Sequence, residues 1–171
     1  MKVNLYRVKD QKNAATRFIN HTFLSFFGTG YAPKAPGTVG SLATIPLIYA
    51  LSYLQISFIT LVILTSVIFI LACLVADIVQ KQEQVFDPGW IVIDEVIGML
   101  ITWMFVFPKV DLVNILLVFG LFRVFDIVKI WPASYFDKQM KNGFATIFDD
   151  VLSAFYAGFF LWLLNYFHWI K

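Results

Sequence analysis

Hydrophobic stretches separated by short polar segments dominate the chain after residue 13. The clearest stretch, 56–76, has about 21 residues and no charged side chain, enough for an α-helix to cross roughly 30 Å of hydrocarbon. A shorter stretch, 39–54, precedes it across Gln55, so the pair predicts a tight helical hairpin. Three further stretches cover residues 90–107, 112–122 and 151–170. The pattern predicts an all-α membrane bundle with about four to five spanning helices.

An amphipathic segment, 14–27, precedes these stretches. Its apolar side chains include Phe18, Phe23, Phe26 and Phe27, and its polar ones include Arg17, Asn20 and His21. This pattern favours a helix lying in the membrane interface, with a re-entrant helix as the alternative. Residues 1–13 are polar and lack the apolar core of a signal peptide, so they are expected to form a cytoplasmic tail. The chain is expected to form a single membrane-embedded domain over residues 1–171.

Composition supports a membrane protein. The chain has 171 residues, of which 60% are hydrophobic and 14% charged, whereas soluble domains average about 45–50% and about 25%. The net charge of +2 argues against nucleic-acid binding. A single cysteine, Cys73, excludes an internal disulfide or a cysteine zinc site within one chain, and His21 and His168 are far apart in sequence.

The basic residues predict the orientation. With the N-terminus inside, the five stretches place eleven of the 13 Lys and Arg residues at or near the cytoplasmic end, and only Lys109 and Lys171 outside. This asymmetry follows the positive-inside rule. Asp111 is the only acidic residue expected outside. We therefore expect a multi-pass protein whose polar end faces the cytoplasm.

Two acidic residues, Asp94 and Glu95, lie near the start of the 90–107 stretch. Charged groups inside membrane helices are costly and usually functional. A pair of carboxylates near the membrane surface suits Mg²⁺, which prefers hard oxygen ligands. Gly98, one turn later, would let a neighbouring helix approach. The alternative is that both acids merely interact favourably with a helix N-terminus.

A second polar group follows the 112–122 stretch. Arg123, Asp126 and Lys129 are spaced by three residues, so they share one helix face, and Pro132 is expected to end that helix. Two cations flanking one acid leave a positive charge that suits a phosphate. The alternative is an internal ladder of salt bridges.

The segment 28–41 is rich in Gly and Pro and precedes the first predicted span. Thr38 is the expected N-cap and Ser41 lies in the first turn, where backbone N–H groups favour phosphate. No complete Walker sequence is present, so an ordinary loop is the alternative.

Asp149 and Asp150 are expected to open the last span. Ala154 and Gly158 follow Asp150 at four-residue steps, so this helix face can pack closely and bury the carboxylate. Favourable interaction with the helix dipole is the alternative explanation for the two acids.

Together these groups indicate metal-assisted phosphoryl transfer or phosphate ester hydrolysis beside lipid. The expected metal ligands for Mg²⁺, in order of preference, are Asp126, Asp150, Asp94, Glu95 and Asp149. The expected catalytic residues are Asp126, Asp150, Asp94, Arg123 and Lys129, and the expected phosphate-binding residues are Thr38, Gly40, Ser41, Arg123 and Lys129. Asp87 is expected to support a ligand or to cap a loop. Water activated by the metal is the expected nucleophile, and an aspartyl-phosphate remains the alternative.

The chain resembles the phosphatidylglycerophosphatase A family in four stretches: 35–42, 91–98, 122–129 and 149–150. The resemblance implies a Mg²⁺-dependent phosphatase of the bacterial inner membrane that removes the terminal phosphate of phosphatidylglycerophosphate. Ile130 and Ala145 depart from the family pattern, which usually has Pro and Gly there. Both positions shape local backbone and are not ligands.

Two other functions share features with this sequence. A small transporter or channel with a carboxylate cluster would need polar residues deep in the spans, yet the 56–76 stretch offers only Thr60, Thr65, Ser66 and Cys73. A CDP-alcohol phosphotransferase would also use Mg²⁺ and clustered aspartates, but its signature sequence is absent. The lipid phosphatase remains the preferred hypothesis, with the transporter as the alternative.

Overall fold

The computed structural model describes residues 14–167, so the predicted tail (residues 1–13) and His168 lie outside the described residues. Within that range every regular element is helical, which confirms the all-α prediction. Residues 14–24 are helical, as the amphipathic pattern predicted. The elements that follow are η1 (Thr29–Tyr31), α2 (Pro36–Tyr53), α3 (Phe58–Glu83), α4 (Ile93–Met104), α5 (Leu112–Val128), α6 (Ala133–Gln139) and α7 (Gly143–Tyr166).

Two of these helices, α3 with 26 residues and α7 with 24, are long and apolar enough to cross a membrane. In the predicted span 90–107, the helix α4 has only 12 residues and is about 18 Å long, shorter than roughly 30 Å of hydrocarbon. Turn-forming Pro88 and Gly89 precede it and Pro108 follows it, so a hydrophobic stretch of span length contains a much shorter helix.

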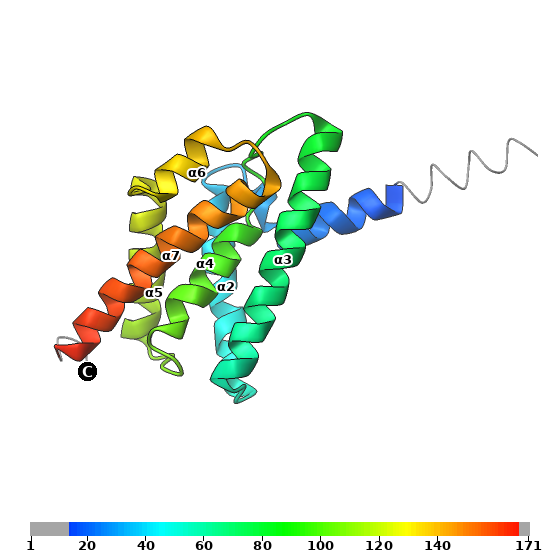
Figure 1. Ribbon diagram of the computed structural model, residues 1–171. Coiled ribbons are helices and arrows are strands. Elements are labelled where there is room, and N and C mark those ends of the chain that lie inside the picture. The colour runs from blue at the N-terminus through cyan, green and yellow to red at the C-terminus, as the bar shows by residue number, and fades with distance from the viewer. Residues whose placement is uncertain (1–13, 168–171) are drawn as a thin grey trace, which may run out of the picture.

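Helix α4 lies at the centre of the bundle and packs against α2, α3, α5 and α7 (Figure 1). Its side chains Ile97, Met99, Leu100 and Trp103 are fully buried. The predicted hairpin has its short turn at residues 54–57, but α2 and α3 do not pack closely along each other. Helix α2 packs mainly on α4, whereas α3 packs mainly on α7 and also contacts α4.

Glycines permit the closest helix contacts. A Cβ placed on Gly98 would overlap the ring of Phe122, which comes from α5. This contact confirms the predicted close approach of a neighbouring helix at Gly98. A Cβ on Gly158 would overlap the ring of Phe105 at the end of α4. These two contacts hold α5 and α7 against α4, and therefore fix the relative depth of the acidic residues on the three helices.

The N-terminal helix (residues 14–24) exposes Phe18 and Ile19 but is anchored on its other side. His21, a polar residue of this helix, is partly buried. Its ring stacks on Trp90 with 4.4 Å between ring centroids, and its Nε2 lies 2.9 Å from Glu83 Oε1. Aromatic stacking and this polar contact outweigh hydration of the imidazole, so the helix is joined to the end of α3 and to the segment before α4.

Candidate active site

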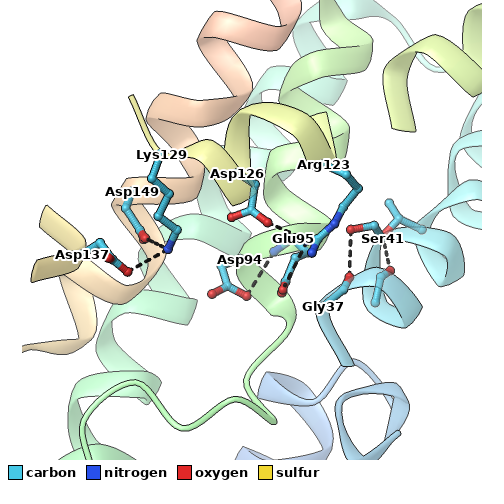
Figure 2. A network of polar contacts seen from close by, with 11 residues as sticks. Gly37, Ser41, Asp94, Glu95, Arg123, Asp126, Lys129, Asp137 and Asp149 are labelled. Atoms are coloured by element: carbon cyan, nitrogen blue, oxygen red, sulfur yellow. Dashed lines mark hydrogen bonds and ion pairs between the residues drawn. The ribbon is translucent and has the colours of Figure 1, made fainter. Parts of the chain in front are cut away.

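The polar residues gather at the end of the bundle where α2, α4 and α7 begin and α5 ends (Figures 1 and 2). Within the described residues, the five acids expected as metal ligands come together there from three helices. Asp94 and Glu95 lie in the first turn of α4, Asp126 in the last turn of α5, and Asp149 and Asp150 on α7.

Three of these acids form a group able to hold a metal ion. One carboxylate oxygen from each of Asp94, Glu95 and Asp150 lies within 4.8 Å of the other two. Asp94 and Asp150 are buried, and Asp94 Oδ1 accepts the backbone N–H of Glu95 at 3.1 Å. Glu95 Oε2 is buried without a hydrogen-bond partner. A buried carboxylate oxygen left unpaired is costly, so this oxygen fits a cation that supplies the missing partner.

Arg123 connects this group to Asp126. Its Nη1 lies 2.7 Å from Asp126 Oδ2 and 3.8 Å from Glu95 Oε1 (Figure 2). The pairing with Asp126 at a spacing of three residues confirms that both share one face of α5. The buried Nε of Arg123 has no hydrogen-bond partner, so the guanidinium keeps a donor for an anion.

The start of α2 faces the same pair. Thr38 was expected to be the N-cap, and that prediction is wrong, because α2 begins at Pro36 with Ala35 as N-cap in a left-handed conformation (φ 47°). Proline at the first helical position fixes φ for a helix and lacks an N–H, which explains the earlier start. No side chain caps this terminus, so Thr38 lies in a first turn whose N–H groups lack a side-chain cap.

Gly37 lies directly against the acidic group, a contact that the sequence pattern did not identify. A Cβ on Gly37 would overlap Glu95 Oε1 and would lie 3.2 Å from Arg123 Nη1. Only glycine leaves space for α2 to place its first turn directly against the Glu95–Arg123 pair. The Pro-Gly pair at a helix start was the available signal.

The other two residues of the predicted phosphate loop make packing contacts. The Ser41 hydroxyl is buried and donates to the Gly37 carbonyl at 2.9 Å. Gly40 faces Val92, where an added Cβ would lie 2.8 Å from the Val92 Cβ. The structure therefore places Gly40 and Ser41 where they support the first turn of α2.

Lys129 lies at the other side of the site. Helix α5 ends at Val128, not at Pro132 as predicted, because Lys129 adopts a left-handed conformation (φ 44°) and caps it. Its Nζ pairs with Asp137 Oδ1 at 2.9 Å and with Asp149 Oδ2 (Figure 2). Burial alone would lower the pKa of Lys129, but the nearby Asp149 and Asp150 carboxylates outweigh burial and raise it.

The prediction of a surplus positive charge on the Arg123–Asp126–Lys129 face is wrong. Both cations are paired with acids, and acids outnumber them within the described part of the site. The acids around Arg123 and Lys129 are Asp87, Asp94, Glu95, Asp126, Asp137, Asp149 and Asp150. The residue spacing on α5 could not reveal the acids contributed by other elements. An excess of buried negative charge favours a bound cation.

The prediction that Asp149 and Asp150 open the last helix is wrong. Helix α7 begins at Gly143, where Asn142 Oδ1 accepts the N–H of Ala145 at 2.8 Å, and the two acids lie in its second turn. A Cβ on Gly143 would overlap the backbone of Asp77, so glycine allows this start to pack directly on α3. The additional turns bring both carboxylates into the bundle.

Two contacts near the acids were missed by the sequence analysis. Asp137 comes from α6, a short helix with no long hydrophobic stretch to reveal it. Gln80 is buried on α3, and its Nε2 donates to Thr146 Oγ1 at 2.9 Å. Asp87 lies in the loop before α4, where burial of its carboxyl group raises its pKa. No spacing rule relates these residues, since each comes from a different element.

Comparison with known proteins identifies relatives of this chain. The family model "Phosphatidylglycerophosphatase A" matches residues 22–165. A phosphatidylglycerophosphatase A of Haemophilus influenzae is 39% identical over 147 residues, covering 85% of this chain and 88% of that protein. The Escherichia coli protein of the same name is 32% identical over 167 residues, covering 96% and 95%.

A third relative, a putative phosphatidylinositol-3-phosphatase of Bacteroides thetaiotaomicron, is 34% identical over 138 residues, covering 77% of this chain and 84% of that protein. No solved structure matches the chain. The matched region includes the whole carboxylate site and the first turn of α2. The chain therefore belongs to the phosphatidylglycerophosphatase A family of phosphoric monoester hydrolases, enzymes of phospholipid biosynthesis.

Proposed function

We propose that this protein is a Mg²⁺-dependent lipid phosphatase that converts phosphatidylglycerophosphate to phosphatidylglycerol and inorganic phosphate. The observation that carries the proposal is the buried Asp94–Glu95–Asp150 group beside Arg123 and the first turn of α2. A cation site and an anion site are adjacent there, as a phosphatase requires. The two relatives named phosphatidylglycerophosphatase A favour this substrate.

The residues fit a divalent cation. Asp94, Glu95 and Asp150 offer hard oxygen ligands, and Glu95 Oε2 lacks any other partner. Asp126 and Asp149 lie close enough to join them or to orient them. A bound Mg²⁺ would polarise the phosphate and lower the pKa of a water molecule at the site.

The phosphate would lie between Arg123 and the start of α2. The free donor at Arg123 Nε and the N–H groups of Gly37 and Thr38 supply hydrogen bonds to its oxygens. These donors neutralise the charge that develops as water attacks phosphorus and the bond to the glycerol oxygen breaks. A carboxylate of the site takes the proton released by the attacking water, and this proton is returned to the glycerol oxygen as that oxygen leaves as an alcohol.

Lys129 has a different role in this proposal. Both of its carboxylate partners, Asp137 and Asp149, satisfy its charge, so it holds α6 and α7 together and orients Asp149 instead of binding phosphate. Gly40 and Ser41 likewise support the first turn of α2. The phosphate contacts are assigned to Arg123, Gly37 and Thr38.

The proposed location is the cytoplasmic face of a bacterial inner membrane, with a multi-pass bundle of four to five spans and a cytoplasmic N-terminus. The two candidate spans α3 and α7 and the bacterial relatives support a membrane location. The distribution of Lys and Arg residues supports the orientation. The site and α6 share one end of the bundle, which this orientation places inside.

Phosphate release from phosphatidylglycerophosphate in detergent micelles tests the proposal. We expect release with Mg²⁺, none after EDTA, and recovery when Mg²⁺ is restored. Release that persists in EDTA would contradict the metal assignment. No release from folded protein would contradict the substrate assignment.

A further inference from the structure

A cavity of about 270 Å³ adjoins the carboxylate site between α6, the start of α7 and the loop before α4. Its polar lining residues are Asp87, Asp137, Lys141, Thr146 and Asp149. Asp149 is shared with the site, so the cavity continues from the carboxylates to the surface of the bundle. The proposed phosphate contacts at Arg123 and α2 lie on the other side of those carboxylates (Figure 2).

The hydroxyl of Thr146 is oriented to donate a hydrogen bond. Its Oγ1 accepts a hydrogen bond from Gln80 Nε2 at 2.9 Å, and Gln80 is 2% exposed. A hydroxyl offers one hydrogen and two lone pairs, so a bond accepted from Gln80 leaves the Thr146 hydrogen for another partner. Gln80 is therefore a positioning residue for a polar ligand in this cavity.

The acids of the cavity are acceptors. Asp149 Oδ2 pairs with Lys129, while its Oδ1 is buried without a hydrogen-bond partner, and Asp149 as a whole is 3% exposed. Asp87 and Asp137 add two further carboxylates. Three carboxylates repel a phosphate but accept hydrogen bonds from alcohol groups. The chemistry of the cavity thus fits an uncharged polyol.

We propose that this cavity binds the glycerol of the lipid head group, the part that lies between the two phosphates, and that Thr146 and Asp87 determine selectivity for it. This inference rests on the proposed function, because it names the group attached to the phosphate that is cleaved. The Thr146 hydroxyl donates to the oxygen of the central glycerol hydroxyl, and the glycerol hydroxyl in turn donates to Asp87. Lys141, at the rim, faces the phosphodiester.

Paired changes in protein and lipid test the inference. The lipids are phosphatidylglycerophosphate and an analogue in which propane-1,3-diol replaces the head-group glycerol, so that only the central hydroxyl is missing. We expect the wild-type protein to favour the hydroxyl-bearing lipid in kcat/KM by about tenfold, the worth of one hydrogen bond in a buried site. Thr146→Val should remove that preference, and Thr146→Ser should retain it.

Thr60→Val is the matched control, since Thr60 lies at the opposite end of α3 and, among the described residues, its hydroxyl bonds only Ser57. It should keep the full preference. The same preference in Thr146→Val as in the wild type would overturn the inference, as would its loss in Thr60→Val. Binding of both lipids measured calorimetrically in EDTA repeats the comparison without turnover. Selective binding of the hydroxyl-bearing lipid by a protein that does not hydrolyse it even with Mg²⁺ would overturn the proposed function and retain the cavity assignment.

Discussion

At the scale of single residues, the structure separates two cations that the sequence pattern treated alike. Arg123 keeps a buried donor without a partner, whereas Lys129 is held by carboxylates from two helices. Guanidinium and ammonium groups also differ in geometry, and only the guanidinium presents a planar set of donors for a phosphate. Substitutions at these positions should therefore affect the reaction in different ways.

Arg123→Ala should lower kcat/KM by about 10² to 10³, the loss seen when one donor to a developing negative charge is removed. Steady-state kinetics in micelles measures the effect. Arg17→Ala is the control, because Arg17 is exposed and pairs only with Glu83 among the contacts described. An unchanged kcat/KM in Arg123→Ala would make Arg123 a structural residue.

Asp126→Asn should abolish phosphate release while the protein stays folded, since it removes the charge that pairs with Arg123 at 2.7 Å. Circular dichroism checks the fold and phosphate release checks activity. Asp77→Asn, the same change at an exposed ion pair on α3, should retain activity. Turnover at the wild-type rate in Asp126→Asn would exclude Asp126 from the catalytic site.

Gly37→Ala should reduce kcat/KM by about 100-fold, the scale expected when catalytic groups are displaced by about 1 Å. The new Cβ would overlap Glu95 Oε1, so α2 or Glu95 must shift. Gly120→Ala is a matched control, because a Cβ on Gly120 of α5 would meet nothing within 4 Å. Equal activity of the two variants would show that the start of α2 does not contribute to the site.

At the scale of helices, N-caps provide a test that separates charge from hydrogen bonding. Asp111 caps α5 by accepting the N–H of Asn114 at 3.0 Å, and Ser57 caps α3 in the same way. The hydrogen bonds from Asn114 lower the pKa of Asp111. A carboxylate with a lowered pKa in the folded state stabilises the protein above its unfolded-state pKa and loses that effect on acidification.

Asp111→Ala should therefore lower the unfolding free energy by about 1 kcal/mol at neutral pH. The difference from the wild type should shrink as the pH falls below about 4. Ser57→Ala should cost a similar amount at every pH, because its hydroxyl does not titrate in this range. Thermal unfolding in detergent across pH measures both, and a constant difference for Asp111→Ala would contradict the charge contribution.

Hydrophobic pattern alone located most helices but not their ends or lengths. The stretch 90–107 is mostly apolar over its 18 positions, yet turn-forming residues on both sides reduce the helix to the 12 residues of α4. Helix α6 was missed because its seven residues contain no apolar periodicity. The acids of the site were identified because charge within apolar sequence is conspicuous. Gly37, Gln80 and Asp137 were not, because their roles depend on contacts between distant segments.

At the scale of the molecule, the acidic residues at the polar end of the bundle predict that a bound cation would stabilise the folded state. Mg²⁺ that binds only the folded protein should raise its stability by about 2.7 kcal/mol at 100 times the dissociation constant. We expect a higher unfolding temperature in Mg²⁺ than in EDTA. The double variant Asp94→Asn with Asp150→Asn should lose this difference, and a difference retained by that variant would place the metal elsewhere.

The central position of α4 has a consequence for how a lipid reaches the site. Because four helices pack against α4 in the described part of the chain, we expect its two acids to be approached from the polar end of the bundle. A lipid whose chains stay in the bilayer must therefore extend its terminal phosphate over the rim of the protein. A glycerol spacer supplies that reach, whereas a phosphate attached directly to diacylglycerol would have to lift its chains out of the hydrocarbon. Under the proposed function, the depth of the carboxylates would select lipids by the length of the head group.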